Sequence, residues 1–299
     1  MKVGGQAVIE GVMMKSKDLW SVAVRDPKGV IHVKKEQLRP LPKFLKTPFI
    51  RGIYALYQSL ALGVQAINYS ASKALDEDEG KPMSSAAITM TMLFAFVMAI
   101  GIFLFLPLYL TKLIALGFRP VAESSFLFNI VDGILRVVFF IVYVFVISLW
   151  KDMRRIFEYH GAEHKVIFAF EAGTDMELAT IQKFGTYHPR CGTSFLFIVM
   201  LMSILVFSII PKQWDFLWKF ASRVVLIPMI AGLSYEILRY SAKSTANPVI
   251  KFLIQPGLLL QRITTKEPDD SQVEVALRAL TEVIPGLKPE VMPDMEKSV

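Results

Sequence analysis

The strongest chemical signal in this sequence is the short motif His160-Gly-Ala-Glu-His164. His160 and His164 are four residues apart, so on a helix both side chains lie on one face, with Glu163 on or beside that face. In this H-x-x-E-H arrangement two imidazoles bind a metal ion and the carboxylate activates a metal-bound water. The motif therefore predicts a metal site in which His160 and His164 are ligands and Glu163 is a general base.

A catalytic metal site needs a third protein ligand and an open position for water. His188 follows 24 residues after His164 and stands beside the only cysteine of the chain, Cys191. Two carboxylates, Glu171 and Glu236, are further candidates. Neutral imidazoles favour Zn²⁺ or another divalent transition metal of intermediate softness. We therefore expect one bound divalent transition metal, with zinc as the first choice.

Each of these residues also has a simpler interpretation. The two motif histidines could be interfacial helix residues paired with nearby glutamates. Glu236 stands near the end of an apolar stretch, where it could be a ligand, pair with Arg239 or Arg136, or reach the membrane interface. Cys191 could act as a nucleophile with His188 as its base, although the sequence shows no third group to orient them.

The composition is that of a membrane protein. The chain has 299 residues, 54% of them hydrophobic, and its mean hydropathy is +0.47. A soluble globular chain is nearer to about 45–50% apolar. The net charge of +7 comes without a nucleic-acid-binding motif, so it indicates membrane topology and we expect no nucleic-acid partner. One cysteine excludes an intrachain disulfide, and we expect no cleavable signal peptide because the N-terminus lacks an apolar core.

Four stretches are long and apolar enough to span a bilayer. They run over about 85–116, 130–150, 193–210 and 216–238. The segments between these stretches alternate between many and few basic residues. Lys and Arg number 13 in 1–84, two in 111–125, six in 151–192, one in 211–215 and eight in 239–299. By the positive-inside rule, both termini and the histidine segment lie in the cytoplasm.

The segment 48–68 has two interpretations because it is long enough to span but carries polar residues. Its apolar residues recur at helical spacing, and they are interrupted by Arg51, Gln58, Gln65 and Asn68. We interpret it as an amphipathic helix at the membrane surface or against the cytoplasmic part. If it spans the bilayer instead, the N-terminal region moves to the outside.

Strand signals precede this segment. The stretches 19–25 and 30–34 alternate apolar and polar residues around Asp26-Pro-Lys-Gly29, which predicts a hairpin. The stretch 6–14 is a candidate third strand.

A helix start is predicted near the C-terminal end. Ser271 as N-cap and Glu274 three residues later form a capping box. The buried stripe of this helix is expected to be Val273, Ala276, Leu277 and Leu280. Residues after Pro285 are expected to form a tail.

These patterns predict an α-helical polytopic protein of the cytoplasmic membrane, with about four transmembrane helices and a small mixed α/β cytoplasmic part. Residues 1–84 form an N-terminal cytoplasmic region with the β-hairpin and the amphipathic helix. Residues 85–238 form the transmembrane region, in which 151–192 is a cytoplasmic metal-site segment on the helix that continues the second span. Residues 239–299 form a C-terminal cytoplasmic region.

Five blocks of the sequence resemble the signature blocks of the YqhQ-like family. They are 4–14, 158–165, 188–195, 234–239 and 264–275, and the resemblance covers nearly the whole chain. The family comprises bacterial membrane proteins with plastid relatives, described as a domain of unknown function and as predicted metal-dependent enzymes. The resemblance implies a polytopic, cytosol-facing membrane protein and supplies no reaction. Family members often carry a second histidine beside the first, which is absent here because Glu158-Tyr159 precede His160.

The leading functional hypothesis is a metal-dependent membrane hydrolase that acts at the cytoplasmic face on a peptide or a lipid-linked substrate. The alternative from another class is a non-catalytic assembly or scaffold factor, which a closed four-ligand structural site would favour. A third is a transporter, for which Glu236 and Arg223 facing one cavity would be the clue. The lipid bilayer is the expected partner in each case, and a homo-oligomer stays open.

Overall fold

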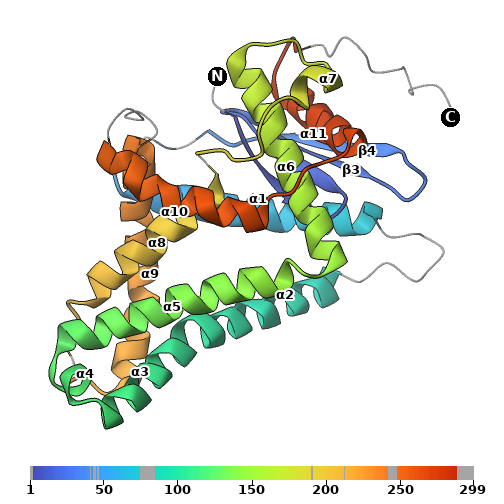
Figure 1. Ribbon diagram of the computed structural model, residues 1–299. Helices are drawn as coiled ribbons and strands as arrows, with labels where there is room; N and C mark the ends of the chain where they lie inside the picture. Colours follow the sequence, from blue (N-terminus) through green and yellow to red (C-terminus); the bar gives the residue numbers. More distant parts are fainter. Residues whose placement is uncertain are drawn as a thin grey trace.

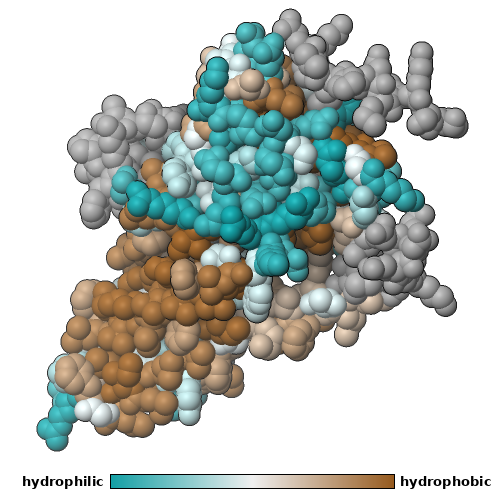
Figure 2. Space-filling model, turned by 45° about the vertical axis from the view of Figure 1, so that its right-hand side comes forward, coloured by the Kyte–Doolittle hydropathy of each residue, from teal (hydrophilic) through white to brown (hydrophobic). Residues whose placement is uncertain are grey.

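The computed structural model describes residues 3–40, 42, 45, 47–74, 85–189, 191–211, 213–241 and 248–287. These residues form two parts, a four-stranded sheet packed between helices and a group of long apolar helices (Figure 1). Polar side chains gather on the surface of the first part, and hydrophobic side chains gather on the surface of the second (Figure 2). The chain is therefore amphipathic on the scale of the whole molecule.

The sheet is an antiparallel meander in the order β1-β2-β3-β4. Its strands are β1 Gly4–Val8, β2 Gly11–Lys15, β3 Leu19–Arg25 and β4 Ile31–Gln37. The predicted hairpin is confirmed as β3 and β4. The prediction of one strand across 6–14 is wrong, because the chain turns at Ile9-Glu10 and pairs Val8 with Gly11. Glu10 has a φ of 51°, a left-handed conformation that ends the first strand and starts the return.

Alternate residues of the strands face opposite sides of the sheet, and both sides are buried. One face packs against α6 Lys151–Ala172 and α11 Asp270–Val283. The other face packs against α1 Ile50–Ala74. Segments from the start, middle and end of the chain therefore share one core, and this fixes α6 against β1.

Three helices are long and apolar enough to cross a membrane among the described residues. The first joins α2 Ser85–Ile100, the π-helical η2 Gly101–Phe105 and α3 Leu106–Gly117 into one rod, which a short turn, α4 Arg119–Glu123, links to the next. The others are α5 Ser125–Ile147 and α9 Phe216–Ser241. They confirm three of the four predicted spans.

The remaining predicted span is α8 Gly192–Phe207, which is apolar but has only 16 residues. A straight helix needs about 20 residues to cross the hydrocarbon core. Cys191 caps its start and Ser208 its end, so the helix is shorter than the apolar stretch in which it lies.

The α1 helix covers most of the ambiguous segment 48–68. Its small and apolar residues Leu62, Gly63 and Ala66 are buried against the sheet, and at its start the helix crosses α9. A Cβ added to Gly52 would lie 2.9 Å from the carbonyl oxygen of Gly232, so the two helices approach closely there. One face of the helix packs on the sheet, as expected for an amphipathic helix that lies against the folded part of the chain.

Two predictions about the remaining helices need correction. The α6 helix does not continue the second span, because the backbone is extended at Trp150 and separates it from α5. The N-cap of α11 is Asp269 rather than Ser271, since the Asp269 carboxylate accepts from the backbone N–H of Gln272 and the Gln272 side chain completes the box. The predicted stripe of α11 is buried as expected. The short α7 Leu178–Ile181 and α10 Pro248–Thr264 were not expected from the sequence.

Candidate metal centre

The α6 helix presents His160 and His164 one turn apart, with their ring centroids 4.5 Å from each other. Gly161 lies between them at a point where the segment after α10 touches the helix. A Cβ on Gly161 would lie 2.0 Å from the carbonyl oxygen of Lys266, whose N–H donates to the carbonyl of Phe157. Glycine therefore permits the close approach that brings backbone carbonyls of residues 264–266 beside the histidines.

Backbone carbonyls orient both imidazoles. The Nδ1 atom of His160 lies 2.8 Å from the carbonyl oxygen of Thr264, and that of His164 lies 2.5 Å from the carbonyl oxygen of Thr186. A carbonyl can only accept, so each Nδ1 carries the hydrogen and each Nε2 keeps its lone pair. Metal-binding histidines usually donate their second nitrogen in this way. Both rings are thus held in the tautomer that binds a metal through Nε2.

Cys191 enters the same site from the start of α8. Its sulfur lies 3.2 Å from Nε2 of His160 and accepts from the backbone N–H and the hydroxyl of Thr193, at 3.5 and 3.3 Å. The residue is buried and is the N-cap of the helix. The sulfur therefore stands at the start of α8 with its lone pairs directed into the site, beside the two histidines.

The donor atoms of His160, His164 and Cys191 all lie within 4.8 Å of one another. Zinc binds nitrogen at about 2.0 Å and sulfur at about 2.3 Å, so two such ligands of a tetrahedral ion lie about 3.5 Å apart. The nitrogen–sulfur distance of 3.2 Å is close to that value. These three residues therefore fit a divalent transition metal in both donor type and spacing.

Glu163 lies beside these ligands and is itself buried. Its carboxylate accepts a hydrogen bond from the backbone N–H of Gly5, on β1, and a Cβ on Gly5 would come within 3.0 Å of Oε1. Burial raises the pKa of Glu163 to about 7, although the nearby His160 and the Gly5 N–H both act to lower it. A carboxyl group with this pKa can take up and release a proton near neutral pH.

His188 is a neighbour of the three-residue group rather than part of it. Its ring centroid lies 5.7 Å from that of His164, and its Nε2 lies 3.5 Å from the carboxylate of Glu171. The Gln261 side chain holds its backbone through both the N–H and the carbonyl, at 2.7 and 2.9 Å. Burial, with His164 nearby, lowers the pKa of His188 to about 4, so the ring is neutral at physiological pH.

The structure places Glu236 in an ion pair away from the histidines. Its Oε1 accepts from Nε of Arg51 at 2.6 Å and from the backbone N–H of Phe49 at 3.2 Å. Of the partners considered from the sequence, Arg239 interacts with Glu236 through its charge, but the hydrogen-bonded partner is Arg51 of α1, and this pair connects α1 to α9. The Glu236 carboxylate therefore bonds to groups where α1 crosses α9, and it is not one of the three residues whose donor atoms lie together.

A second buried polar cluster lies within the apolar helices. Asp132 of α5 accepts from Arg136 at 2.8 Å and from Arg223 of α9 at 2.9 Å, and Arg223 also donates to Asn129 at 2.9 Å. The ring centroid of Phe207 lies 4.9 Å from the guanidinium carbon of Arg136 and 5.3 Å from that of Arg223. Arg223 is fully buried in this network.

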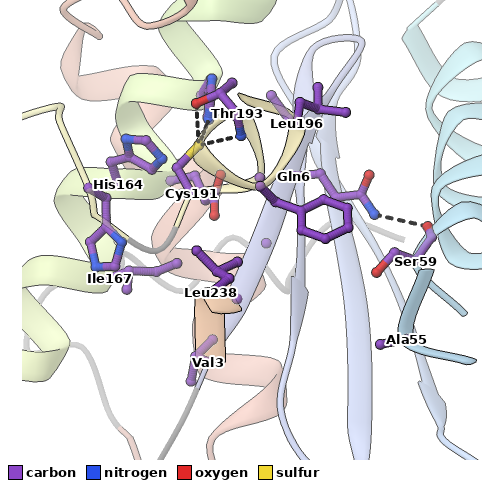
Figure 3. Close-up of a pocket in the computed structure, with 18 of the residues that line it drawn as sticks. Val3, Gln6, Ala55, Ser59, His164, Ile167, Cys191, Thr193, Leu196 and Leu238 are labelled. Carbon is purple, nitrogen blue, oxygen red and sulfur yellow. Dashed lines mark hydrogen bonds between the residues drawn. The ribbon is translucent and has the colours of Figure 1, made fainter. Parts of the chain in front are cut away.

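A cavity of about 550 Å³ opens beside the metal ligands, between β1, α1, α6, α8 and α9. Figure 3 shows His164 and Cys191 on one side of it and Ala55 and Ser59 of α1 on the other. Glu163 and His188 also line it. The three-ligand group therefore borders a space large enough for a small substrate.

The backbone groups that build this site could not be predicted from residue type. The carbonyls of Thr264 and Thr186 orient the histidines, and a backbone carbonyl is the same in every residue type. Gly5 and Gly161 were visible as residues of two signature blocks. A glycine inside a helix costs roughly 0.5–1 kcal/mol relative to alanine, so Gly161 between two histidines could have indicated a close contact.

Comparison with known proteins gives a family but no activity. A family model described as "Protein of unknown function (DUF1385)" matches residues 47–285. The uncharacterized protein YqhQ of Bacillus subtilis (strain 168) is 33% identical over 297 residues, covering 94% of this chain and 92% of that protein. No solved structure matches. The matched family region begins after the sheet and includes all three candidate ligands.

Proposed function

This chain belongs to the DUF1385 family of proteins of unknown function, and we propose that it is a metal-dependent membrane hydrolase that acts at the cytoplasmic face of the bilayer. The observation that carries the proposal is the convergence of two oriented Nε2 lone pairs and one capped thiol beside a cavity. A structural zinc site is closed by four protein ligands, whereas a catalytic one keeps a position open. Three ligands next to a cavity favour the catalytic kind.

In this proposal His160, His164 and Cys191 hold the metal, which when bound polarises the substrate and makes water a nucleophile near neutral pH. Glu163 accepts a proton from the attacking water and returns it to the leaving group. The N–H of Gly5 keeps the Glu163 carboxylate in place for this transfer. In this proposal the sheet positions the general base, because the N–H comes from β1.

The proposed topology places the sheet, α6 and α11 in the cytoplasm. The Lys/Arg distribution supports this side, and α8 serves as the short fourth membrane segment. The transporter hypothesis gains no support, because Glu236 pairs with Arg51 and Arg223 pairs with Asp132, in separate places. The scaffold hypothesis would fit better if a fourth protein ligand closed the site.

The test is the metal content of the full chain purified in detergent. Wild type should carry one transition metal per chain by elemental mass spectrometry, and the His160→Ala/His164→Ala double variant should carry none. His32→Ala is the matched control, because His32 lies on β4, paired with Asp26 at 2.8 Å, and should keep the metal. Equal metal content in the double variant and wild type would overturn the proposal.

A second function, a cysteine-dependent enzyme, is favoured by one specific observation. Nε2 of His160 lies 3.2 Å from the sulfur of Cys191, and the Thr264 carbonyl orients the ring, which is the arrangement of a nucleophile, a base and an orienting group. The metal-dependent and the cysteine-dependent hypotheses predict different roles for His164. A thiol–imidazole pair does not need it, so His164→Ala should keep rapid alkylation of Cys191 by iodoacetamide. A metal centre needs it, so the same variant should lose metal.

A further inference from the structure

The walls of the cavity beside the metal centre are mainly apolar. They include Leu56 of α1, Phe195 and Leu196 of α8, Ile167 of α6 and Leu238 of α9. Polar side chains line it in two places, with His164 and Cys191 on one side and Gln6 and Ser59 on the other (Figure 3). A ligand that fills this space would present hydrocarbon to most of the wall and one polar group to the metal ligands.

The cavity lies where the two parts of the molecule meet. Its upper wall comes from β1 and α6 of the sheet part, and its lower wall comes from α8 and α9 of the apolar part. Polar and hydrophobic surface are separated along this same level (Figure 2). A boundary of this kind corresponds to the interface of the bilayer, so the cavity lies at the depth of lipid headgroups and upper acyl chains.

The α1 helix supports this position independently. Tyr57, Leu60, Val64 and Ile67 are three or four residues apart, so they form one stripe, and the first two are 67% and 61% exposed. Another face of the helix is buried on the sheet through Leu62 and Ala66, and Leu56, at the edge of the exposed stripe, lines the cavity. An exposed apolar stripe on a helix parallel to the interface fits the acyl region of a membrane.

We propose that the cavity binds the hydrocarbon chain of a membrane amphiphile, taken from the bilayer past α1 and α8. This deepens the proposed hydrolase, on which the chemistry at the polar end rests, but hydrocarbon binding itself does not depend on the metal. Hydrolysis would add water across the bond next to the ligands. One product keeps the chain and returns to the bilayer, and the other leaves as a polar fragment.

The experiment uses the full chain in lipid nanodiscs that contain a phospholipid with a diazirine in its acyl chain. After irradiation, labelled peptides are identified by mass spectrometry. Residues on the outside of the apolar helices are labelled in any case, so the decisive site is Ile167 on α6, which is 3% exposed. We expect a label there, and a label confined to outward residues of α2, α5 and α9 would overturn the inference.

Two variants on α1 provide a matched pair. Ala55→Trp places a large ring in the cavity and should lower the Ile167 label by about tenfold, since added volume is poorly accommodated there. Leu60→Trp places the same ring on the exposed stripe and should leave it unchanged. Equal labelling of Ile167 in the two variants would contradict the proposal.

Two further measurements keep the result interpretable. In wild type, excess unlabelled fatty acid should reduce the Ile167 label if a free chain suffices, whereas only unlabelled phospholipid should do so if the headgroup is also needed. No competition by either would overturn the inference without relying on a variant that must fold. The His160→Ala/His164→Ala variant should keep the label while losing metal, so failure of the metal centre and failure of lipid binding give different results.

Discussion

Two buried polar clusters of the described residues differ in the kinds of groups that they bring together. In the cluster of Asp132, Arg136 and Arg223 a carboxylate stands between two guanidiniums, and the ring of Phe207 faces both cations. At the metal centre two imidazole nitrogens and a sulfur, all of them metal-binding donors, come together, and the sulfur contacts Nε2 of His160 at 3.2 Å. In the first cluster the charged groups face one another, although Nε of Arg136 and Nε of Arg223 have no hydrogen-bond partner. The second cluster brings together donors of a type and spacing that could hold a metal ion.

Because of this difference, we expect substitutions in the first cluster to lower the stability of the protein and substitutions at the metal centre to impair its function. A buried ion pair that loses one partner leaves a charge in apolar surroundings, so a change in the first cluster acts on the polar connection between α5 and α9. A change at the metal centre removes a ligand or a proton carrier at the edge of a cavity, where packing is looser. Each of the following variants tests whether the two clusters can be perturbed independently.

The largest expected effect is on function at the metal centre. Glu163→Gln removes the general base without removing a ligand, so it should keep the metal and lower turnover by about 10²- to 10⁴-fold. The measurements are metal content of the purified protein and complementation of a strain that lacks the gene.

Full complementation by Glu163→Gln with metal retained would favour the scaffold hypothesis. Loss of metal would instead make Glu163 a ligand or a residue required for folding. Glu177→Gln on the loop before α7 is a control for the same chemical change outside the cavity.

The next effect is on stability in the apolar helices. Asp132→Asn leaves two buried guanidiniums without a carboxylate and should destabilise the protein by about 3–5 kcal/mol. Thermal unfolding in detergent measures this, and metal per folded chain should stay at the wild-type value. Asp215→Asn makes the same change at an exposed position and should shift the unfolding midpoint little. Equal midpoints for the two variants would remove the structural role given to Asp132.

The sequence predicted local features of both parts well, because these depend on spacing. The i, i+4 histidines on one helix and the β3–β4 hairpin follow from periodicity, and the three long apolar helices follow from the length and hydropathy of their segments. The sequence left His188 or Cys191 open as the third ligand, with two carboxylates as further candidates, because the choice depends on how the turn before α8 folds back. The Glu236–Arg51 pair joins residues 185 positions apart and could not be read from local pattern.

An intermediate effect is expected where the backbone approaches α6. Gly161→Ala forces the segment at Lys266 away from the helix and should cost about 1–3 kcal/mol of stability. Because the Thr264 carbonyl moves with that segment, metal affinity should fall by about 10- to 100-fold.

Gly101→Ala is the matched control for Gly161→Ala, since a Cβ there would meet nothing within 4 Å. It should keep full metal affinity. If Gly161→Ala also kept full affinity, the carbonyl of Thr264 would not be the group that orients His160.

The smallest effect is expected at Glu236, which belongs to neither cluster. Its ion pair with Arg51 is partly exposed, and pairs of this kind contribute about 0–1 kcal/mol. Glu236→Gln keeps an acceptor for the N–H of Phe49, so the unfolding midpoint should change slightly and metal content should equal that of wild type. Arg51→Gln should behave in the same way, because it breaks the same pair from the other side. A drop in metal content with Glu236→Gln but not with Arg51→Gln would show that this carboxylate serves the metal directly. Glu236 would then belong to the metal centre as well as to the contact between α1 and α9.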